Sequence, residues 1–515
     1  MRRFGALLAW SVAVFLVLSL VGSAAGPRWE PPAWTVPAPV AGADTTIAPA
    51  LPATPPVGTY GVRRFPAVVH LEPGVSVDAT VRLPEGAPGP VPGVVILHGT
   101  GTWGADAFFD LTEALASAGV ASIVTAKRGT GYTAFERDYD ALAADYARSV
   151  EALRGVSEVD AERVGLYGES EGAMIAPLLA STDERLAFLV LSAAPVVPLR
   201  EQSAFAADNY LRNTHVPVTV RRAIPRVLGG PVPDGLMAYL DVDVRPALRR
   251  VTQPVLTVYG TADTSMPLIQ GPSVLSGLLS APQTVRYYAD GTHGLRIDGV
   301  LIPEFPRDVA RWIELGPGGA GEAPTVAGAV PVQVIAAGPV PKPWVSLTAL
   351  VVVAALGLAG VLVGVMAGSA AVVSDVRTRR HLREGGAAVR LRDLPGGGRR
   401  LRGSGTRLVL AVALLWYCYA FYFTEIVNLA LNYRINDAVV RGGLAVVYTV
   451  ALLAAGCLVA HARRIVAERG RLRGSGGSVP LGGSRFGLVA LIATTTGAVA
   501  LQLVAAYVGA HPLLF

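Results

Sequence analysis

Four long apolar segments in the last third of the chain constrain its fold more than any other feature. None of them contains Asp, Glu, Lys or Arg, and they are Val345–Val373, Leu408–Thr424, Gly442–Ala460 and Phe486–Phe515. A helix of about 20 apolar residues crosses the ~30 Å hydrocarbon core of a bilayer. Hydrophobic residues make up 52% of the 515 residues, which is high for a purely soluble protein. We predict an all-α membrane region over residues 344–515, with transmembrane helices at about 345–373, 408–430, 442–460 and 486–509.

The charge between these segments predicts their orientation. Ser374–Arg407 holds ten Arg against three acidic residues, and Arg463–Arg485 holds six Arg against one Glu, so the net charges are +7 and +5. Because positive loops stay in the cytoplasm, we expect both stretches inside and the preceding part of the chain outside. The predicted location is a multi-pass cell-membrane protein with an extracytoplasmic domain. These arginines are interpreted as signals for membrane orientation rather than as a nucleic-acid-binding surface. No nucleic-acid partner is therefore expected.

The N-terminus carries an export signal. Met1-Arg2-Arg3 precedes a charge-free run from Phe4 to Pro27, and Ser23–Ala25 offers small residues for cleavage. Residues 1–27 therefore form a signal peptide or an uncleaved signal anchor. Residues 28–60 and 316–343 are rich in Pro, Ala and Gly and are predicted to be linkers.

Residues 61–315 alternate between strand and helix patterns, which predicts an α/β domain with a mostly parallel sheet covered by helices on both faces. Val75–Leu83 alternates like an exposed edge strand. We expect the other strands at Val91–His98, Val120–Ala126, Arg163–Tyr167, Leu186–Ser192, Pro254–Tyr259 and Thr284–Tyr288, and helices at Ala105–Ala118, Ala134–Arg154, Glu171–Ala180 and Pro306–Leu315. Residues 196–251 interrupt the alternation and are expected to form a cap over the carboxyl edge of the sheet.

A nucleophile motif sits at one of these strand ends. Gly168-x-Ser170-x-Gly172 follows the strand at Arg163–Tyr167 and opens a helix, which is the strand–turn–helix context that exposes a serine hydroxyl. Asp263 follows the strand at Pro254–Tyr259, and His293 follows the last strand. Because ligands bind at the carboxyl edge of such sheets, we expect these side chains to lie together.

This arrangement predicts a Ser-His-Asp triad. An imidazole takes the proton of the serine, and a carboxylate holds the imidazole in the required tautomer. Backbone N–H groups of Glu171, Gly99 and Thr100 are candidates for an oxyanion hole. Two sets of residues compete for the triad roles: the histidines His70, His98 and His215, and the aspartates Asp241, Asp243 and Asp290. No His, Cys or acidic cluster has the spacing of a metal site, and no metal or other cofactor is expected.

The segment Gly168-Glu-Ser-Glu-Gly-Ala-Met-Ile-Ala-Pro resembles the nucleophile turn of bacterial serine carboxylesterases near the dienelactone hydrolase and prolyl-oligopeptidase branches of the α/β-hydrolases. Lys127-Arg-Gly-Thr-Gly131 is similar to a second motif of that family. The resemblance covers about Val62–Leu315. It implies an α/β-hydrolase fold with Ser170 as nucleophile, Asp263 as acid and His293 as base. The chain departs from the family at Glu169, where a histidine is usual, and at Ala173, where a second glycine is usual.

The sequence thus predicts a membrane-tethered extracytoplasmic serine hydrolase acting on a small-molecule or lipid-like carboxylic ester. An acyltransferase or a serine peptidase would use the same triad, and a non-catalytic binding module is an alternative of a different class. The lipid bilayer is the expected second partner. The sequence leaves the substrate and the oligomeric state open.

Overall fold

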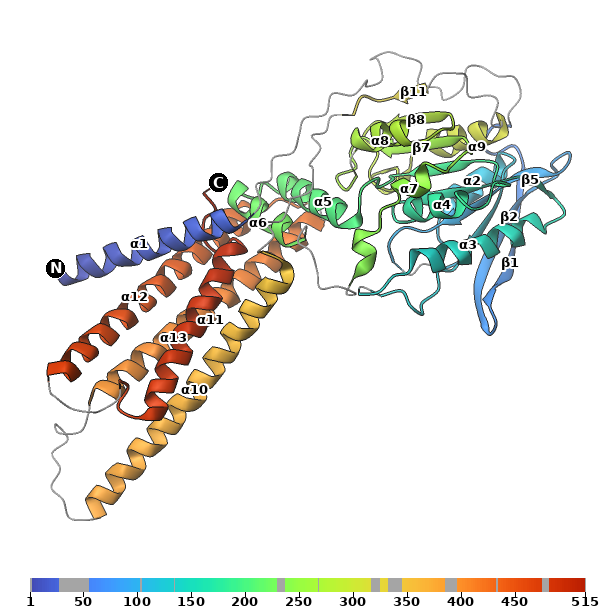
Figure 1. The fold of residues 1–515 in the computed structure, drawn as a ribbon. Helices are drawn as coiled ribbons and strands as arrows, with labels where there is room; N and C mark the ends of the chain where they lie inside the picture. The colour runs from blue at the N-terminus through green and yellow to red at the C-terminus, as the bar shows by residue number, and fades with distance from the viewer. Residues whose placement is uncertain are drawn as a thin grey trace. The chain divides into compact units, whose positions relative to one another are not determined.

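The computed structural model separates the chain into two compact units. One unit comprises Glu30–Ala206 and Asp234–Gly338, and the other comprises Met1–Trp29, Ala207–Pro233 and Pro339–Phe515. The structure describes residues 2–26, 55–101, 104–133, 135–228, 237–266, 268–315, 325–331, 345–384, 396–431, 434–474 and 481–514. Each unit is described by itself below (Figure 1).

The first unit, the sheet unit, is built on a nine-stranded sheet with the order β1-β2-β4-β3-β5-β6-β7-β8-β11. The strands are β1 (Gly61–Glu72), β2 (Val75–Glu85), β3 (Val91–Leu97), β4 (Ala121–Thr125), β5 (Val159–Glu169), β6 (Leu189–Ser192), β7 (Val255–Gly260), β8 (Gln283–Tyr288) and β11 (Thr325–Gly328). The β1–β2 and β2–β4 pairs are antiparallel, and all the others are parallel. A short hairpin, β9 (Arg296–Ile297) with β10 (Val300–Leu301), follows β8.

Helices cover both faces of this sheet, as β3 illustrates. Every residue of β3 is buried, because Val95 and Leu97 face one hydrophobic cluster while Val94 and Ile96 face another. The first cluster includes side chains of α3 (Tyr139–Arg154), α4 (Gly172–Ala180) and α8 (Gln270–Leu278), and the second includes side chains of α2 (Phe109–Ser117) and α9 (Glu304–Leu315). A parallel sheet buried on both faces is the fold class predicted from the sequence, which is confirmed.

Two strands differ from the sequence expectation. β2 is not an edge strand, because β1 pairs with it on the side away from β4. Strand β1 was not predicted from the sequence, because it has exposed positions on both faces and so lacks a strict alternation. β11 lies inside the predicted linker 316–343 and pairs in parallel with β8, so this part of the linker is strand. The remaining residues of the two predicted linkers lie outside the described residues, apart from 55–60 and 329–331.

Among the residues that the structure describes, the second unit, the helical unit, contains five helices that are long and apolar enough to cross a membrane. They are α1 (Arg2–Ala25), α10 (Leu347–Glu384), α11 (Gly396–Leu431), α12 (Leu444–Gly474), which follows a π-helical turn at Ala438–Gly443, and α13 (Arg485–Tyr507). Figure 1 shows the last four running alongside one another. These helices fit the membrane region predicted from the sequence.

Helix α1 packs against the rest of this unit. A Cβ placed on Gly22 would lie 2.4 Å from the carbonyl oxygen of Ala506, so the two backbones are in direct contact. The N–H of Leu514 donates to Oγ of Ser23 at 2.7 Å, and the ring of Phe15 lies 5.1 Å from that of His511. Helix α1 therefore packs against the C-terminal end of α13 and the residues that follow it.

The helical unit also includes about half of the segment that the sequence predicted as a cap. Helices α5 (Leu199–Asn213) and α6 (Val218–Leu228) are followed by a 3₁₀ turn at Ala238–Asp241 and α7 (Arg245–Leu248) before β7 begins. Leu211, Val216 and Val220 join a buried cluster with side chains of α11 and α12. The hydroxyls of Thr219 and Tyr448 are 3.0 Å apart. Residues 207–233 of the expected cap thus group with the helical unit rather than with the sheet.

Candidate active site

Ser170 occupies a sharp turn between β5 and α4. Its φ of 55° is in the left-handed region, which is uncommon for a residue other than glycine. A Cβ on Gly168 would lie 2.5 Å from the oxygen of Gly172, and a Cβ on Gly172 would lie 2.2 Å from the oxygen of Leu97. Neither glycine tolerates a side chain, because the turn brings backbone against backbone. The motif spacing is thus explained by close packing around the serine.

Asp263 and His293 are held together at the ends of neighbouring strands. Asp263 follows β7 and His293 follows β8, and Oδ2 of Asp263 lies 2.9 Å from Nδ1 of His293. The other carboxylate oxygen of Asp263 accepts the backbone N–H groups of Ser265 and Met266, at 2.7 and 3.2 Å. Asp263 is also buried, with 2% exposure. The hydrogen bonds therefore hold a carboxylate that is shielded from water and oriented toward the imidazole.

The neighbouring carboxylates decide the ionisation of His293. Burial by itself lowers the pKa of this imidazole, but the charge and hydrogen bond of Asp263, together with the charge of Glu169, raise the pKa to about 9. Glu169 is next to Ser170 in sequence, and its carboxylate accepts a hydrogen bond of 3.3 Å from Tyr167. Burial raises the pKa of Glu169 itself, while the charge of His293 opposes that rise.

A cavity of about 480 Å³ lies beside Ser170, Glu169 and His293. Ser170 and His293 both line it, as do Gly99 and Thr100, two of the predicted oxyanion donors. A Cβ on Gly99 would lie 3.4 Å from Cβ of Ser170, so the loop after β3 is in contact with the nucleophile position. Apolar side chains form much of the remaining wall: Ala107, Phe108, Leu111, Leu301 and Phe305.

The third predicted donor, Glu171, is the residue directly before α4. Its side chain is completely buried. Its carboxylate accepts four hydrogen bonds, from Lys127 at 2.8 Å, Tyr132 at 2.6 Å, Arg137 at 2.5 Å and Tyr139 at 2.9 Å. Burial raises the pKa of this carboxyl, but the charge of Lys127 and these hydrogen bonds outweigh it and lower the pKa. Glu171 is therefore an ionised carboxylate whose four donors satisfy it.

This buried network reaches the loop beside Ser170. Lys127 also donates to the carbonyl oxygen of Gly99 at 2.7 Å, and the N–H of Gly101 donates to the hydroxyl of Tyr132 at 2.9 Å. The sequence alone does not reveal the partners of Glu171. The motif that begins at Lys127 is a signal for this part of the site, but it indicates a family resemblance and not a contact with Glu171. Tyr132, Arg137 and Tyr139 carry no signal of their own, because only the fold brings them to Glu171.

Other candidates have structural surroundings of their own. His98 is buried, its Nε2 lies 2.6 Å from the oxygen of Thr125, and burial lowers its pKa to about 4. His70 lies on the exposed strand β1 beside Ser76, and His215 belongs to the helical unit. The rival aspartates have other roles: Asp241 pairs with Arg200, Asp243 pairs with Arg245, and Asp290 sits in a turn with a φ of 54°.

Among the described residues, no group of three or more His, Cys, Asp or Glu side chains could hold a metal ion. The polar groups of the cavity are instead suited to nucleophilic and acid–base chemistry. A serine at a strained turn, an imidazole and an oriented carboxylate are the components of nucleophilic catalysis.

No protein-family model matches the chain, and no curated protein matches it. Solved structures similar to it include dienelactone hydrolase from Anabaena variabilis, with 15% identity over 50% of this chain and 99% of that one, at a TM-score of 0.36. Est1E from Butyrivibrio proteoclasticus is 16% identical over 48% of this chain and 97% of its own, at a TM-score of 0.35. A 2,6-dihydroxy-pseudo-oxynicotine hydrolase is 21% identical over 52% of this chain and 71% of its own, at a TM-score of 0.36.

Proposed function

We propose that this chain, an α/β-hydrolase-fold protein joined to a membrane region, is a membrane-tethered serine hydrolase that cleaves carboxylic esters. One observation carries the proposal: His293, which is hydrogen-bonded to Asp263, lines the same cavity as Ser170. The fold class and the apolar helices are the parts that the structure establishes. The triad, its chemistry and the extracytoplasmic location are what we propose.

The proposed reaction has two stages. Oγ of Ser170 attacks the ester carbonyl carbon while its proton passes to the ring nitrogen of His293 opposite Nδ1. The alcohol then leaves with that proton, and an acyl-enzyme remains on Ser170. Water next attacks the acyl carbon, gives a proton to His293, and releases the carboxylic acid as Ser170 regains its proton. Asp263 stays ionised throughout and stabilises the imidazolium that forms in each stage.

Backbone donors beside Ser170 would stabilise the oxyanion. Among the described residues, no acceptor takes the N–H of Glu171 or of Gly99, and both groups adjoin the serine. Glu171 also stands at the start of α4, where N–H groups and the helix dipole favour negative charge. Loss of one oxyanion donor typically costs about 3 kcal/mol of transition-state stabilisation. We therefore assign these two N–H groups to the oxyanion hole, with Thr100 completing the loop.

The cavity favours an uncharged ester with an apolar group. Its apolar wall, with Phe108 and Phe305, suits a hydrocarbon substituent, and its volume lies at the small-molecule end of ligand pockets. Glu169 places a carboxylate next to the nucleophile and would repel an anionic substrate there. Arg296 also lines the cavity, although it pairs with Asp110 at 2.8 Å. A small-molecule or lipid-like ester is the proposed substrate class.

A fluorophosphonate probe tests the nucleophile directly. The intact full chain in detergent should label at Ser170, and Ser170→Ala should abolish both labelling and ester turnover while the protein still folds. A panel of esters, matched amides and acceptor alcohols then separates an esterase from a peptidase and an acyltransferase. Residual ester turnover above about a thousandth of wild type would exclude Ser170 as nucleophile. A chain that neither labels nor turns over any substrate would be the non-catalytic binding module.

A further inference from the structure

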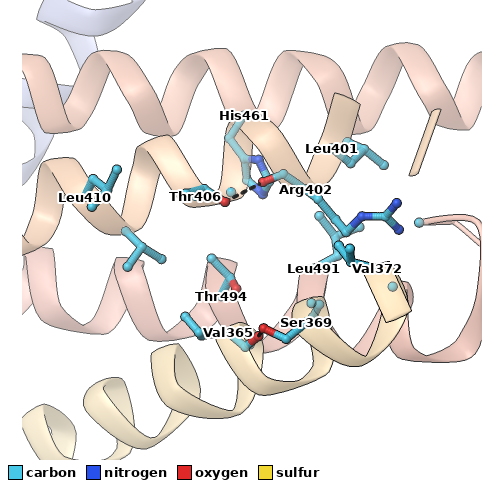
Figure 2. A pocket seen from close by; sticks show the side chains of 17 residues that line it. Val365, Ser369, Val372, Leu401, Arg402, Thr406, Leu410, His461, Leu491 and Thr494 are labelled. Atoms are coloured by element: carbon cyan, nitrogen blue, oxygen red, sulfur yellow. Dashed lines mark hydrogen bonds between the residues drawn. The ribbon is translucent and has the colours of Figure 1, made fainter. Parts of the chain in front are cut away.

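The helical unit holds a cavity of about 340 Å³ that the hydrolase proposal does not use. It is enclosed by residues of α10, α11, α12 and α13 (Figure 2). Its residues on these helices fall where each apolar segment meets its flanking arginines. Val372 lies near the end of the first segment, Leu410 near the start of the second, His461 directly after the third, and Gly487 near the start of the fourth. The cavity therefore lies at one end of the apolar part of the bundle.

Glycine spacing on α10 explains why a cavity forms at this level. A Cβ on Gly360 would lie 3.0 Å from the oxygen of Ala493, and a Cβ on Gly364 would lie 2.2 Å from Oγ1 of Thr494. A Cβ on Gly368 would find its nearest neighbour, Cβ of Ala490, only at 3.9 Å. Helices α10 and α13 thus touch closely along one stretch and separate by Gly368, and the cavity occupies the gap.

A buried polar chain ties the other three helices together beside the cavity. Nδ1 of His461 on α12 lies 2.8 Å from Oγ of Ser404 on α11, and its Nε2 lies 3.1 Å from Oγ1 of Thr495 on α13. His461 and Ser404 are buried. Hydrogen bonds between helices at this depth fix the helices relative to one another. The cavity is therefore preformed by the packing of the bundle.

One arginine lines this otherwise mostly apolar cavity. Arg402 on α11 pairs with Asp375 on α10, and its side chain is 15% exposed. A guanidinium presents five N–H donors in a planar fork, so a single carboxylate leaves donors for a second anion. In the sequence, the stretch Ser374–Arg407 to which it belongs holds ten Arg against three acidic residues.

We propose that this cavity binds an anionic phospholipid, with the headgroup phosphate at Arg402 and one acyl chain between α10 and α13. An arginine fork matches the geometry of a phosphate, and a basic pocket between transmembrane helices is where anionic headgroups bind. The apolar wall formed by Val365, Leu410 and Leu491 matches a hydrocarbon chain. The volume, near the lower limit of about 300 Å³ for ligand pockets, fits one chain rather than a whole lipid.

Lipid retention by the purified full chain tests this proposal. The protein in detergent is incubated with phosphatidylglycerol or with phosphatidylcholine of the same acyl chains, and bound lipid is counted by native mass spectrometry. We expect one tightly retained phosphatidylglycerol. Arg402→Gln should weaken its retention about fivefold to tenfold, because a cation near the phosphate is lost. Gly368→Leu should abolish it, because the new side chain enters the cavity without meeting backbone.

Two variants serve as matched controls on α11. Arg407→Gln removes the same charge from an exposed position outside the cavity, and Gly403→Leu adds the same side chain where a Cβ meets nothing within 4 Å. Both should retain lipid as the wild type does. Equal loss in Arg407→Gln, equal retention of phosphatidylcholine, or displacement of the lipid by inorganic phosphate would each overturn the proposal. If Gly368→Leu fails to fold, the comparison of Arg402→Gln with Arg407→Gln decides alone.

Discussion

Oδ2 of Asp263 lies 2.9 Å from Nδ1 of His293, although the two residues are 30 positions apart and follow different strands. The pairing exists because β7 and β8 are parallel neighbours in the sheet, so that both strands end at the same edge. Two backbone N–H groups also donate to the carboxylate of Asp263 and orient it toward the imidazole. The proposed roles can be tested separately for the acid Asp263, the base His293 and the neighbouring carboxylates Glu169 and Glu171.

Asp263→Asn should lower kcat by about 10⁴-fold without unfolding the protein, because an amide in place of the carboxylate favours the wrong imidazole tautomer. Ester turnover of the purified full chain measures the effect. Asp290→Asn is the matched control: Asp290 sits in a left-handed turn that Asn also adopts, so its turnover should stay within a few-fold of wild type. A comparable loss in both variants would reassign the acid.

The pH dependence of kcat/KM should report the ionisation of His293. The base must be neutral, and its pKa in the free enzyme is raised to about 9, so kcat/KM should climb with pH and level off near that value. The same shift affects stability with a definite sign. Protonated His293 stabilises the fold fully below its ordinary pKa of 6.5, and this contribution disappears as the pH rises through about 9.

Glu169→Gln should move that limb to lower pH, because the variant lacks a charge that raises the pKa of His293. Glu136→Gln removes an exposed carboxylate elsewhere in the same unit and should leave the limb in place. The two profiles, measured with one uncharged ester, make the comparison. Identical profiles in wild type and Glu169→Gln would show that Glu169 does not act on the imidazole.

Glu171→Gln should destabilise the sheet unit by about 3–5 kcal/mol, because it leaves the charges of Lys127 and Arg137 buried without their carboxylate. The temperature at which fluorophosphonate labelling is lost is the readout, and Glu136→Gln again serves as the control. Since the pKa of Glu171 is lowered in the fold, its contribution to stability is present above the ordinary carboxyl pKa and declines as the pH falls through the lowered value. A variant as stable as the control would show that the network contributes nothing to stability.

The predicted topology places the two ends of α12 on opposite sides of the membrane. In a chain lacking Cys418 and Cys457, single cysteines at Asn436 and Gly470 mark those ends, and both positions are exposed. A membrane-impermeant thiol reagent on intact cells should label Asn436→Cys but not Gly470→Cys. The reverse result would invert the bundle and place the proposed hydrolase in the cytoplasm.

The sequence predicted those parts of the fold in which local pattern and tertiary structure agree. The strands at the centre of the sheet are continuous apolar runs because both their faces are buried, and β3 shows this most clearly. Strand β1 escaped prediction because it lies at the edge, where Arg63, Arg64 and Pro66 are tolerated. Strand β11 was not predicted because it has only four residues and is held in the sheet by its backbone pairing with β8.

The candidate site divides in a similar way. The positions of Ser170, Asp263 and His293 after their strands are visible in the sequence, because the turn chemistry and the chain order are local signals. The side-chain partners of Glu171 are not, because they converge from four positions between Lys127 and Tyr139 only once β4, α3 and α4 have packed. The same holds for residues 207–233, whose apolar side chains match a helix pattern but do not reveal which unit they pack against.

The contacts of α1 set the order in which the helical unit can be completed. Ser23 meets Leu514, 491 positions later, and Gly22 meets Ala506, so these contacts of α1 form only after α13 and the residues that follow it have been made. A chain that ended before α13 would therefore leave α1 without its contacts at Ala506 and Leu514.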